Sequence, residues 1–237
     1  VGARRMALQD IAGSEAKKAA ALGARELVTK PMYEEAMQLS VPVDESLREL
    51  FKRPSMRNAL SQAQAIAAIT RDLSRFLPYL LLGVTGSGKT EVYLRVIAAV
   101  LQAGRQSLLL VPEISLTPQL EATVRGRFPG TRVVSLHSGL SESERLQHWL
   151  AAQSGSARIV LGTRLAVFTP LPQLGVIVVD EEHDTSFKQG EGIRYHARDL
   201  ALVRAKLSGC PIVLGSATPS LETFHNAKSG KHTYLEL

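Results

Sequence analysis

The sequence contains a single cysteine, Cys210, among 237 residues. One thiol excludes an internal disulfide and any metal site built from several cysteines, and a thiol before an apolar run is typical of a buried core position. Aromatic residues make up only 5% of the chain, and no uninterrupted apolar run approaches the roughly 18 residues of a membrane-spanning helix. No apolar signal core follows the first residues, so secretion is not indicated. We expect a cytoplasmic protein with no membrane partner.

The charge of the chain is moderately positive. Lys and Arg number 28 against 22 for Asp and Glu, which gives a net charge of +6. An excess of positive charge suits a polyanionic partner, but many basic proteins bind none, so charge alone favours nucleic acid only slightly. The length allows one medium-sized domain with a small appendage.

The first quarter of the chain differs in pattern from the rest. Ser14 is a suitable helix N-cap, Gly23 a suitable helix stop, and a short strand follows. We interpret residues 1–30 as a partial winged-helix-like segment and residues 31–57 as a polar, proline-containing linker. The sequence begins at Val1 and stops after Tyr-Leu-Glu-Leu without a terminal signal, so we expect it to be part of a longer chain.

From residue 58 onward, short apolar runs alternate with helical patterns. Runs rich in Val, Leu and Ile on both faces, separated by helices, are typical of a parallel sheet that is covered on both sides. The sequence therefore predicts one α/β domain over residues 58–237. The six predicted strands are Tyr79–Leu82, Ser107–Val111, Arg132–Leu136, Arg158–Leu161, Val176–Val179 and Pro211–Leu214.

A phosphate-binding motif follows the first predicted strand. The pattern G-x-x-x-x-G-K-[ST] lies after an apolar run and before a helical pattern, which is the context it requires. Its glycines let backbone N–H groups turn toward phosphates, its lysine reaches the outer phosphates, and its final hydroxyl can bind Mg²⁺. The motif predicts a nucleoside triphosphate site made by Gly83, Thr85, Gly86, Ser87, Gly88, Lys89 and Thr90.

Two adjacent carboxylates end another predicted strand. Asp180 and Glu181 follow the apolar run 176–179 and so lie at the carboxyl end of the sheet, where ligands bind in open α/β folds. Asp180 can hold the Mg²⁺ that bridges the phosphates, and Glu181 can deprotonate the attacking water. With Lys89, these are the candidate catalytic residues. A solvated turn is the alternative interpretation.

A Ser-Ala-Thr motif follows the last predicted strand. Ser216 and Thr218 are placed to hydrogen-bond with the turn from Asp180 to His183 and so to sense its state. We predict that His183, Ser216 and Thr218 couple the nucleotide site to the rest of the domain.

These motifs, in this order, resemble the superfamily 2 helicases, and the segments around them resemble the bacterial replication-restart helicases of that superfamily. The resemblance covers residues 58–237. It implies the first of two RecA-like lobes, ATP and Mg²⁺ as cofactors, and zinc sites elsewhere in the family for which this chain has no ligands. The matching segments are 84–94, 111–119, 136–145, 162–170, 180–199 and 214–222.

The resemblance also implies a function for the longer protein. That function is ATP-dependent 3′ to 5′ unwinding of DNA at stalled or abandoned replication forks, with initiation of primosome assembly. The implied partners are forked and single-stranded DNA, single-stranded DNA-binding protein and primosome proteins. Two alternatives stay open, namely a module that binds ATP and DNA without turnover on its own, and the lobe of a translocase on duplex DNA.

Further contacts follow from the resemblance. Gln64 would lie near adenine, although an exposed polar helix residue is an equally good interpretation. Thr117, Gln119 and Arg164 would contact the DNA backbone, and their hydroxyl, amide and guanidinium groups suit phosphates. Ordinary helix capping is the alternative there, with Ser115 as the expected cap.

The segment 187–198 combines cations with aromatic rings. Stacking on an aromatic side chain contributes roughly 1–3 kcal/mol per base, so Phe187 and Tyr195 beside Lys188 and Arg194 suit single-stranded DNA. In the family this loop couples DNA binding to ATP hydrolysis. Ile193 occupies a position where an aromatic residue is expected. A solvated loop with both rings packed into the core is the alternative.

Overall fold

The computed structural model describes residues 54–237, and the chain divides into two units at Ala67 and Ala68. The predicted winged-helix-like segment (1–30) and most of the linker (31–57) lie outside the described residues. Helix α5 (Pro54–Thr70) is the first described element. The second unit, residues 68–237, contains every predicted strand and is described by itself below.

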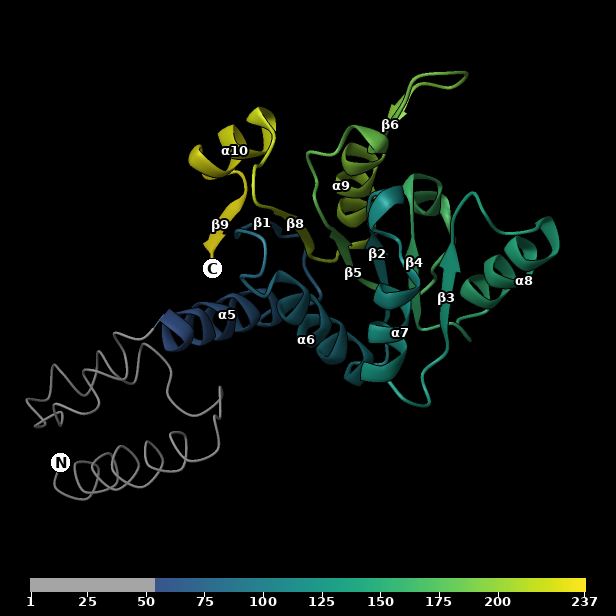
Figure 1. The fold of residues 1–237 in the computed structure, drawn as a ribbon, viewed down its shortest axis with the longest axis horizontal. Helices are drawn as coiled ribbons and strands as arrows, with labels where there is room; N and C mark the ends of the chain where they lie inside the picture. The colour runs from purple at the N-terminus through teal and green to yellow at the C-terminus, as the bar shows by residue number, and fades with distance from the viewer. Residues whose placement is uncertain (1–53) are drawn as a thin grey trace, which may run out of the picture. The chain divides into compact units, whose positions relative to one another are not determined.

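A seven-stranded parallel sheet forms the centre of this unit, in the order β3-β4-β2-β5-β8-β1-β9 (Figure 1). All six predicted strands are present, so the predicted α/β, RecA-like architecture is confirmed. The strands are β1 (Pro78–Leu82), β2 (Gln106–Leu110), β3 (Val133–Leu136), β4 (Ile159–Gly162), β5 (Leu174–Val179), β8 (Ile212–Ser216) and β9 (Thr233–Glu236).

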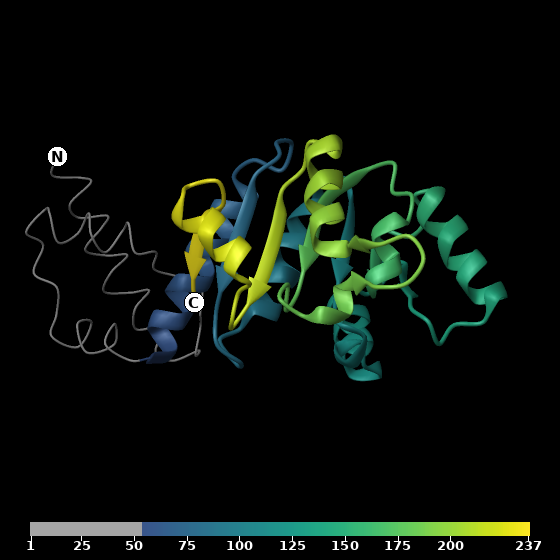
Figure 2. The same ribbon diagram turned by 90° about the horizontal axis from the view of Figure 1, so that it is seen from above.

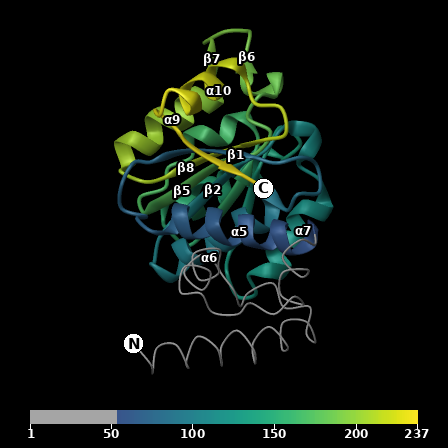
Figure 3. The same ribbon diagram turned by 90° about the vertical axis from the view of Figure 1, so that its left-hand side faces the viewer.

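Helices cover both faces of the sheet. Figure 3 shows α9 and α10 on one face and α6 on the other. Strands with both faces covered are mostly apolar, and every residue of β2, β3, β4, β5 and β8 is buried. The helices are α6 (Lys89–Gln102), α7 (Pro118–Arg127), α8 (Glu142–Gln153), α9 (Ala197–Ser208) and α10 (Leu221–Lys228).

Side-chain caps define where several helices begin. Ser141 and Glu144 form a capping box at the start of α8. Thr117, rather than the expected Ser115, caps α7 by accepting a hydrogen bond from the backbone N–H of Leu120. The prediction for Ser115 was wrong because Glu113–Ser115 forms a short 3-10 turn (η2), which delays the start of α7 by two residues.

Two features were not predicted. Strand β9 pairs with β1 at the edge of the sheet, and its exposed, polar ends leave no apolar run in the sequence. The segment after β5 forms a two-stranded antiparallel hairpin from β6 (Lys188–Gln189) and β7 (Tyr195–His196). This hairpin, residues 188–196, projects away from the sheet (Figures 1 and 2).

Candidate functional site

The phosphate loop, residues 83–90, connects β1 to α6. Gly86 and Gly88 have φ values of 81° and 92°, in the left-handed region that glycine adopts without strain. Helix α6 begins at Lys89, so the backbone N–H groups of its first turn are free of intrahelical partners and form an anion-binding end. The backbone N–H of Gly83 donates to the carbonyl of Ser216 at 3.1 Å. The loop is thereby attached to the strand that carries the Ser-Ala-Thr motif.

Lys89 and Glu181, which lie far apart in the sequence, meet in the structure. The Lys89 ammonium is nearly buried, donates to the carbonyl of Gly83 at 2.8 Å and forms an ion pair with Glu181 at 3.3 Å. The partly exposed carboxylate thus stands beside the lysine that is predicted to reach the outer phosphates. Thr85 and Thr90 are exposed on the same loop. The residues of the phosphate loop and Glu181 therefore lie together at the carboxyl ends of β1 and β5.

Asp180 is held by a residue that the sequence did not reveal. The hydroxyl of Tyr93, from α6, donates to Asp180 Oδ1 at 2.9 Å. Burial raises the pKa of Asp180 and the Glu181 charge adds to this, while the Tyr93 hydrogen bond and Lys89 oppose it. Gly215 is needed beside this pair, because a β-carbon there would overlap the Tyr93 hydroxyl.

Glu181 has an unusual backbone conformation. Its φ is 46°, and it is the one non-glycine residue between 54 and 237 with a positive φ. Such a conformation costs on the order of 1–3 kcal/mol and persists only where the surroundings enforce it. The turn is closed by a hydrogen bond of 2.8 Å from the Asp184 N–H to the Glu181 carbonyl. The strain lies at the residue that was predicted to activate water.

The predicted link between the acidic turn (residues 180–183) and the Ser-Ala-Thr motif is present. His183 Nδ1 lies 2.8 Å from Ser216 Oγ, and His183 Nε2 lies 3.4 Å from Thr218 Oγ1. The Ser216 hydroxyl also accepts a hydrogen bond of 2.9 Å from the Thr218 N–H. His183 Nδ1 lies 3.8 Å from the Glu181 carboxylate. His183 thus lies between the predicted catalytic base and the two hydroxyls of the Ser-Ala-Thr motif.

Most of the residues predicted to bind DNA lie either at the start of α7 or on the hairpin. Gln119 is exposed at the start of α7, whereas the hydroxyl of Thr117 is engaged as the cap of that helix. Lys188 and Arg194 are exposed on the hairpin, and Tyr195 is half-buried against Phe168, with ring centroids 5.1 Å apart at 75°. The exposed groups remain available to a DNA strand.

Two of these predictions need correction. Phe187 is fully buried, so it belongs to the core and is not available to a base. Arg164 donates from Nη1 to the carbonyls of Ser186 and Lys188, both at 3.1 Å. Its guanidinium therefore holds the backbone where the hairpin begins. For Phe187 the core-packing alternative was right, because an apolar ring gains more from burial than from exposure.

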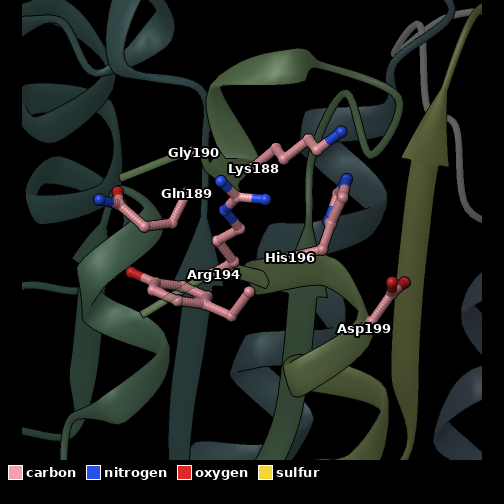
Figure 4. A pocket seen from close by; sticks show the side chains of 7 residues that line it. Lys188, Gln189, Gly190, Arg194, His196 and Asp199 are labelled. Atoms are coloured by element: carbon pink, nitrogen blue, oxygen red, sulfur yellow. The ribbon is translucent and has the colours of Figure 1, made fainter. Parts of the chain in front are cut away.

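A cavity of about 560 Å³ lies at the hairpin. Figure 4 shows Arg194 between Gln189 and His196 in this cavity. Burial, followed by the charge of Arg198, lowers the pKa of His196 and so favours the neutral imidazole. The Tyr195 hydroxyl and His196 Nδ1 are buried without a hydrogen-bond partner among the described residues. The cavity thus combines the exposed cations Lys188 and Arg194 with the rings of Tyr195 and His196.

Comparison with known proteins identifies the family. The family model described as DEAD/DEAH box helicase matches residues 60–227. The chain belongs to the DEAD/DEAH box helicase family. This membership agrees with the resemblance to superfamily 2 helicases and with the order of the motifs along the chain.

Curated relatives within this family carry the name "Replication restart protein PriA". The chain is 42% identical to that of Bacillus subtilis over 81% of its length and 51% identical to that of Haemophilus influenzae over 69%. It covers 25% and 22% of those two proteins, so it spans about a quarter of the length of the curated relatives it matches. The predicted resemblance to replication-restart helicases is confirmed.

Solved helicase structures share the fold. RecG bound to a three-way DNA junction superimposes with a TM-score of 0.52 at 23% identity, covering 73% of this chain and 23% of RecG. The DEAD-box helicase Mss116 bound to single-stranded RNA gives 0.55 at 17% identity, covering 74% of this chain and 39% of Mss116. At these identities the likeness establishes the RecA-like fold of the helicase lobe.

Helicases of this family use ATP and Mg²⁺, and the residues of this structure fit both. A nearly buried ammonium at a helix N-terminus suits phosphates, and oxygen ligands such as the Asp180 carboxylate and the exposed Thr90 hydroxyl are of the kind that Mg²⁺ prefers. Between residues 54 and 237 no group of three or more His, Cys, Asp or Glu side chains could hold a metal by itself. Within those residues no helix is both long and apolar enough to span a membrane. Gln64 is exposed on α5, and its contact with adenine stays a prediction.

Proposed function

We propose that this chain is the ATP-binding motor lobe of a DNA helicase that unwinds 3′ to 5′ at stalled or abandoned replication forks and initiates primosome assembly. The observation that carries the proposal is the meeting of Lys89, Glu181 and Asp180 at the sheet edge, connected through His183 to Ser216 and Thr218. The printed name of the relatives supports the role in replication restart.

The roles of the chain's own residues follow from this geometry. Bound Mg·ATP supplies the phosphoryl group and the leaving ADP. Lys89 would hold the outer phosphates, so its ion pair with Glu181 would weaken and the Glu181 carboxylate would be left to accept a proton from water. Asp180 and Thr90 would hold Mg²⁺, which would offset the negative charge of the phosphates. His183 then reports the state of Glu181 to the Ser-Ala-Thr motif.

DNA contact is assigned to the exposed groups of the hairpin and of α7. Lys188 and Arg194 bind phosphates, Tyr195 and the cavity take a base, and Gln119 contacts the backbone. Forked and single-stranded DNA are the proposed substrates. Single-stranded DNA-binding protein and primosome proteins are the proposed partners of the longer protein, and the cytoplasm is its proposed location.

Steady-state ATP hydrolysis tests the proposal. The chain is assayed with Mg²⁺ at low salt, with and without forked, single-stranded and duplex DNA, alongside Glu181→Gln. We expect turnover that rises with forked or single-stranded DNA and is lost in Glu181→Gln. In related enzymes an arginine supplied by a partner contributes about 10³–10⁵ in rate, so we expect a low absolute rate when this lobe is assayed by itself.

Other outcomes support the two alternatives. Stimulation by duplex DNA alone would favour a duplex translocase. No turnover under any condition, with nucleotide binding abolished in Lys89→Ala, would make this chain a binding module.

A further inference from the structure

One carboxylate of the acidic turn has no part in the proposed chemistry and is fully buried. Glu182 lies between Glu181 and His183 and has no exposed surface. A buried carboxylate is costly unless its oxygens are paired and hydrogen-bonded. Glutamate is almost never fully buried unless it is paired, so the burial of this carboxylate requires an explanation.

Both oxygens of Glu182 are fully used. Oε1 accepts from the backbone N–H of Ser220 at 2.7 Å. Oε2 accepts from the hydroxyls of Ser220 at 3.2 Å and Thr223 at 2.9 Å, and forms an ion pair with Arg198 Nη1 at 3.1 Å. Arg198 also donates to the Ser220 hydroxyl at 2.7 Å and pairs with Asp199 at 2.8 Å. The result is a closed network around one carboxylate.

The partners come from two separate parts of the proposed machinery. Arg198 is in the first turn of α9, two residues after the hairpin strand β7. Ser220 caps α10 and Thr223 lies in its first turn, directly after the Ser-Ala-Thr motif. Arg198 belongs to the segment that was predicted to contact DNA, but it is nearly buried. It therefore faces inward, from the hairpin toward the acidic turn.

Glu182 also fixes the backbone of the proposed base. Its N–H donates to the carbonyl of Gly215 at 3.0 Å, and the residue before it is Glu181, with its φ of 46°. A strained conformation needs neighbours that hold it. The buried side chain and the backbone bond of Glu182 anchor one side of the turn, and the bond from Asp184 anchors the other.

We propose that Glu182 is a positioning residue that connects the hairpin to the nucleotide site, so that displacement of Arg198 by DNA binding moves Glu181. This inference rests on the proposed function, because it assumes that the chain binds both nucleotide and DNA. Replacing a buried ion pair with apolar groups is often neutral or stabilising, so stability alone does not account for this network. A network that joins the acidic turn, α9 and α10 at one carboxylate is instead explained by a role in connecting these elements.

The test measures coupling and not stability alone. If two sites are coupled, DNA changes nucleotide affinity by a factor that equals the effect of nucleotide on DNA affinity, typically about 5–150-fold. The affinity of the whole chain for a fluorescent non-hydrolysable ATP analogue with Mg²⁺ is measured with and without a single-stranded oligonucleotide. We expect Glu182→Gln to bind each ligand alone within a few-fold of the wild type, while the coupling factor falls to less than about twofold.

Two further variants complete the design. Glu222→Gln removes an exposed carboxylate from the same helix as Thr223, and its coupling should equal that of the wild type. Thr223→Val keeps the side-chain shape but removes one donor to Glu182, and its coupling should be intermediate. If thermal unfolding shows that Glu182→Gln does not fold, the Thr223→Val variant is used for the test in its place.

The outcomes separate this inference from the proposed function. A wild-type chain that binds no nucleotide, or whose nucleotide affinity DNA does not change, overturns the proposed function and this inference with it. A coupled wild type with equally coupled, folded Glu182→Gln or Thr223→Val overturns only the role of Glu182. Equal loss of coupling in Glu222→Gln also overturns it.

Discussion

At the scale of single residues, Tyr93 has the clearest testable role. Its hydroxyl lowers the pKa of Asp180 against the raising effect of burial. Tyr93→Phe removes this hydrogen bond, so the pKa of Asp180 should rise further and protons should compete with Mg²⁺ at higher pH. We expect Mg²⁺-dependent nucleotide affinity to fall by roughly 1 kcal/mol, about fivefold, with a larger loss as the pH decreases.

Titration of nucleotide binding with Mg²⁺ between pH 5 and pH 8 measures this effect. Tyr79→Phe is the matched control, since its hydroxyl donates to the carbonyl of Ala68 at 3.0 Å, away from the acidic turn. Equal Mg²⁺ dependence in Tyr93→Phe and the wild type would show that the hydroxyl does not act on Asp180.

Cys210 permits a second prediction at this scale. It is fully buried before β8, and burial raises its pKa to about 11. The thiolate is the reactive form, so at pH 8 almost none is present in the folded chain. We expect a thiol reagent to label the native chain only at the rate of unfolding, and to label it completely in denaturant. Rapid native labelling would contradict the burial of this strand end.

At the scale of elements, two arginines contribute to the hairpin in different ways. Arg164 holds the hairpin backbone through two carbonyls, whereas Arg194 is exposed in the cavity. Arg164→Ala should lower the thermal midpoint, because it removes two hydrogen bonds to the hairpin backbone, each contributing about 1 kcal/mol. Arg194→Ala should leave the midpoint unchanged but weaken single-strand binding and reduce the salt slope by about 0.7.

Thermal unfolding and DNA titrations at several salt concentrations distinguish these variants. The reverse assignment, with Arg194→Ala destabilised and Arg164→Ala altered only in its salt slope, would mean that Arg164 is the phosphate contact first predicted.

The same element shows where sequence reasoning stops. Periodicity predicted six of the seven strands of the sheet, because buried parallel strands leave nearly uninterrupted apolar runs. The spacing within the phosphate loop and the acidic turn is local, so those residues were also predicted. The inward direction of Phe187 and Arg164 depends on packing between distant segments, and β9 depends on pairing with β1. None of these features leaves a recognisable pattern within a short stretch of sequence.

Glu182 and Tyr93 were missed for the same reason. Glu182 is adjacent in sequence to Glu181, whose chemistry is evident, and Tyr93 lies within an ordinary helical pattern. Their partners, Arg198 and Asp180, lie 16 and 87 positions away along the chain. A buried carboxylate beside two functional ones cannot be distinguished by composition or spacing. Local sequence patterns therefore indicated the phosphate loop and the acidic turn, but they did not indicate the groups that position these elements.

At the scale of the whole molecule, nucleotide binding should stabilise the domain by mass action. A ligand at 100 times its dissociation constant adds about 2.7 kcal/mol, which corresponds to roughly 5–10 °C in a domain of this size. Lys89→Ala removes the ammonium at the phosphate loop and leaves Glu181 without its ion pair, so this shift should disappear. Melting curves with and without Mg²⁺ and a non-hydrolysable ATP analogue measure it.

Lys188→Ala is the control for this experiment, because Lys188 is an exposed cation of the hairpin and not of the phosphate loop. It should keep the full nucleotide shift and lose part of the stabilisation by single-stranded DNA. A nucleotide shift that survives in Lys89→Ala would place the phosphates elsewhere and remove the basis for assigning Glu181 as the base. A shift lost in both variants would mean that the hairpin and the phosphate loop form one binding site, with Lys188 supplying charge to the nucleotide directly.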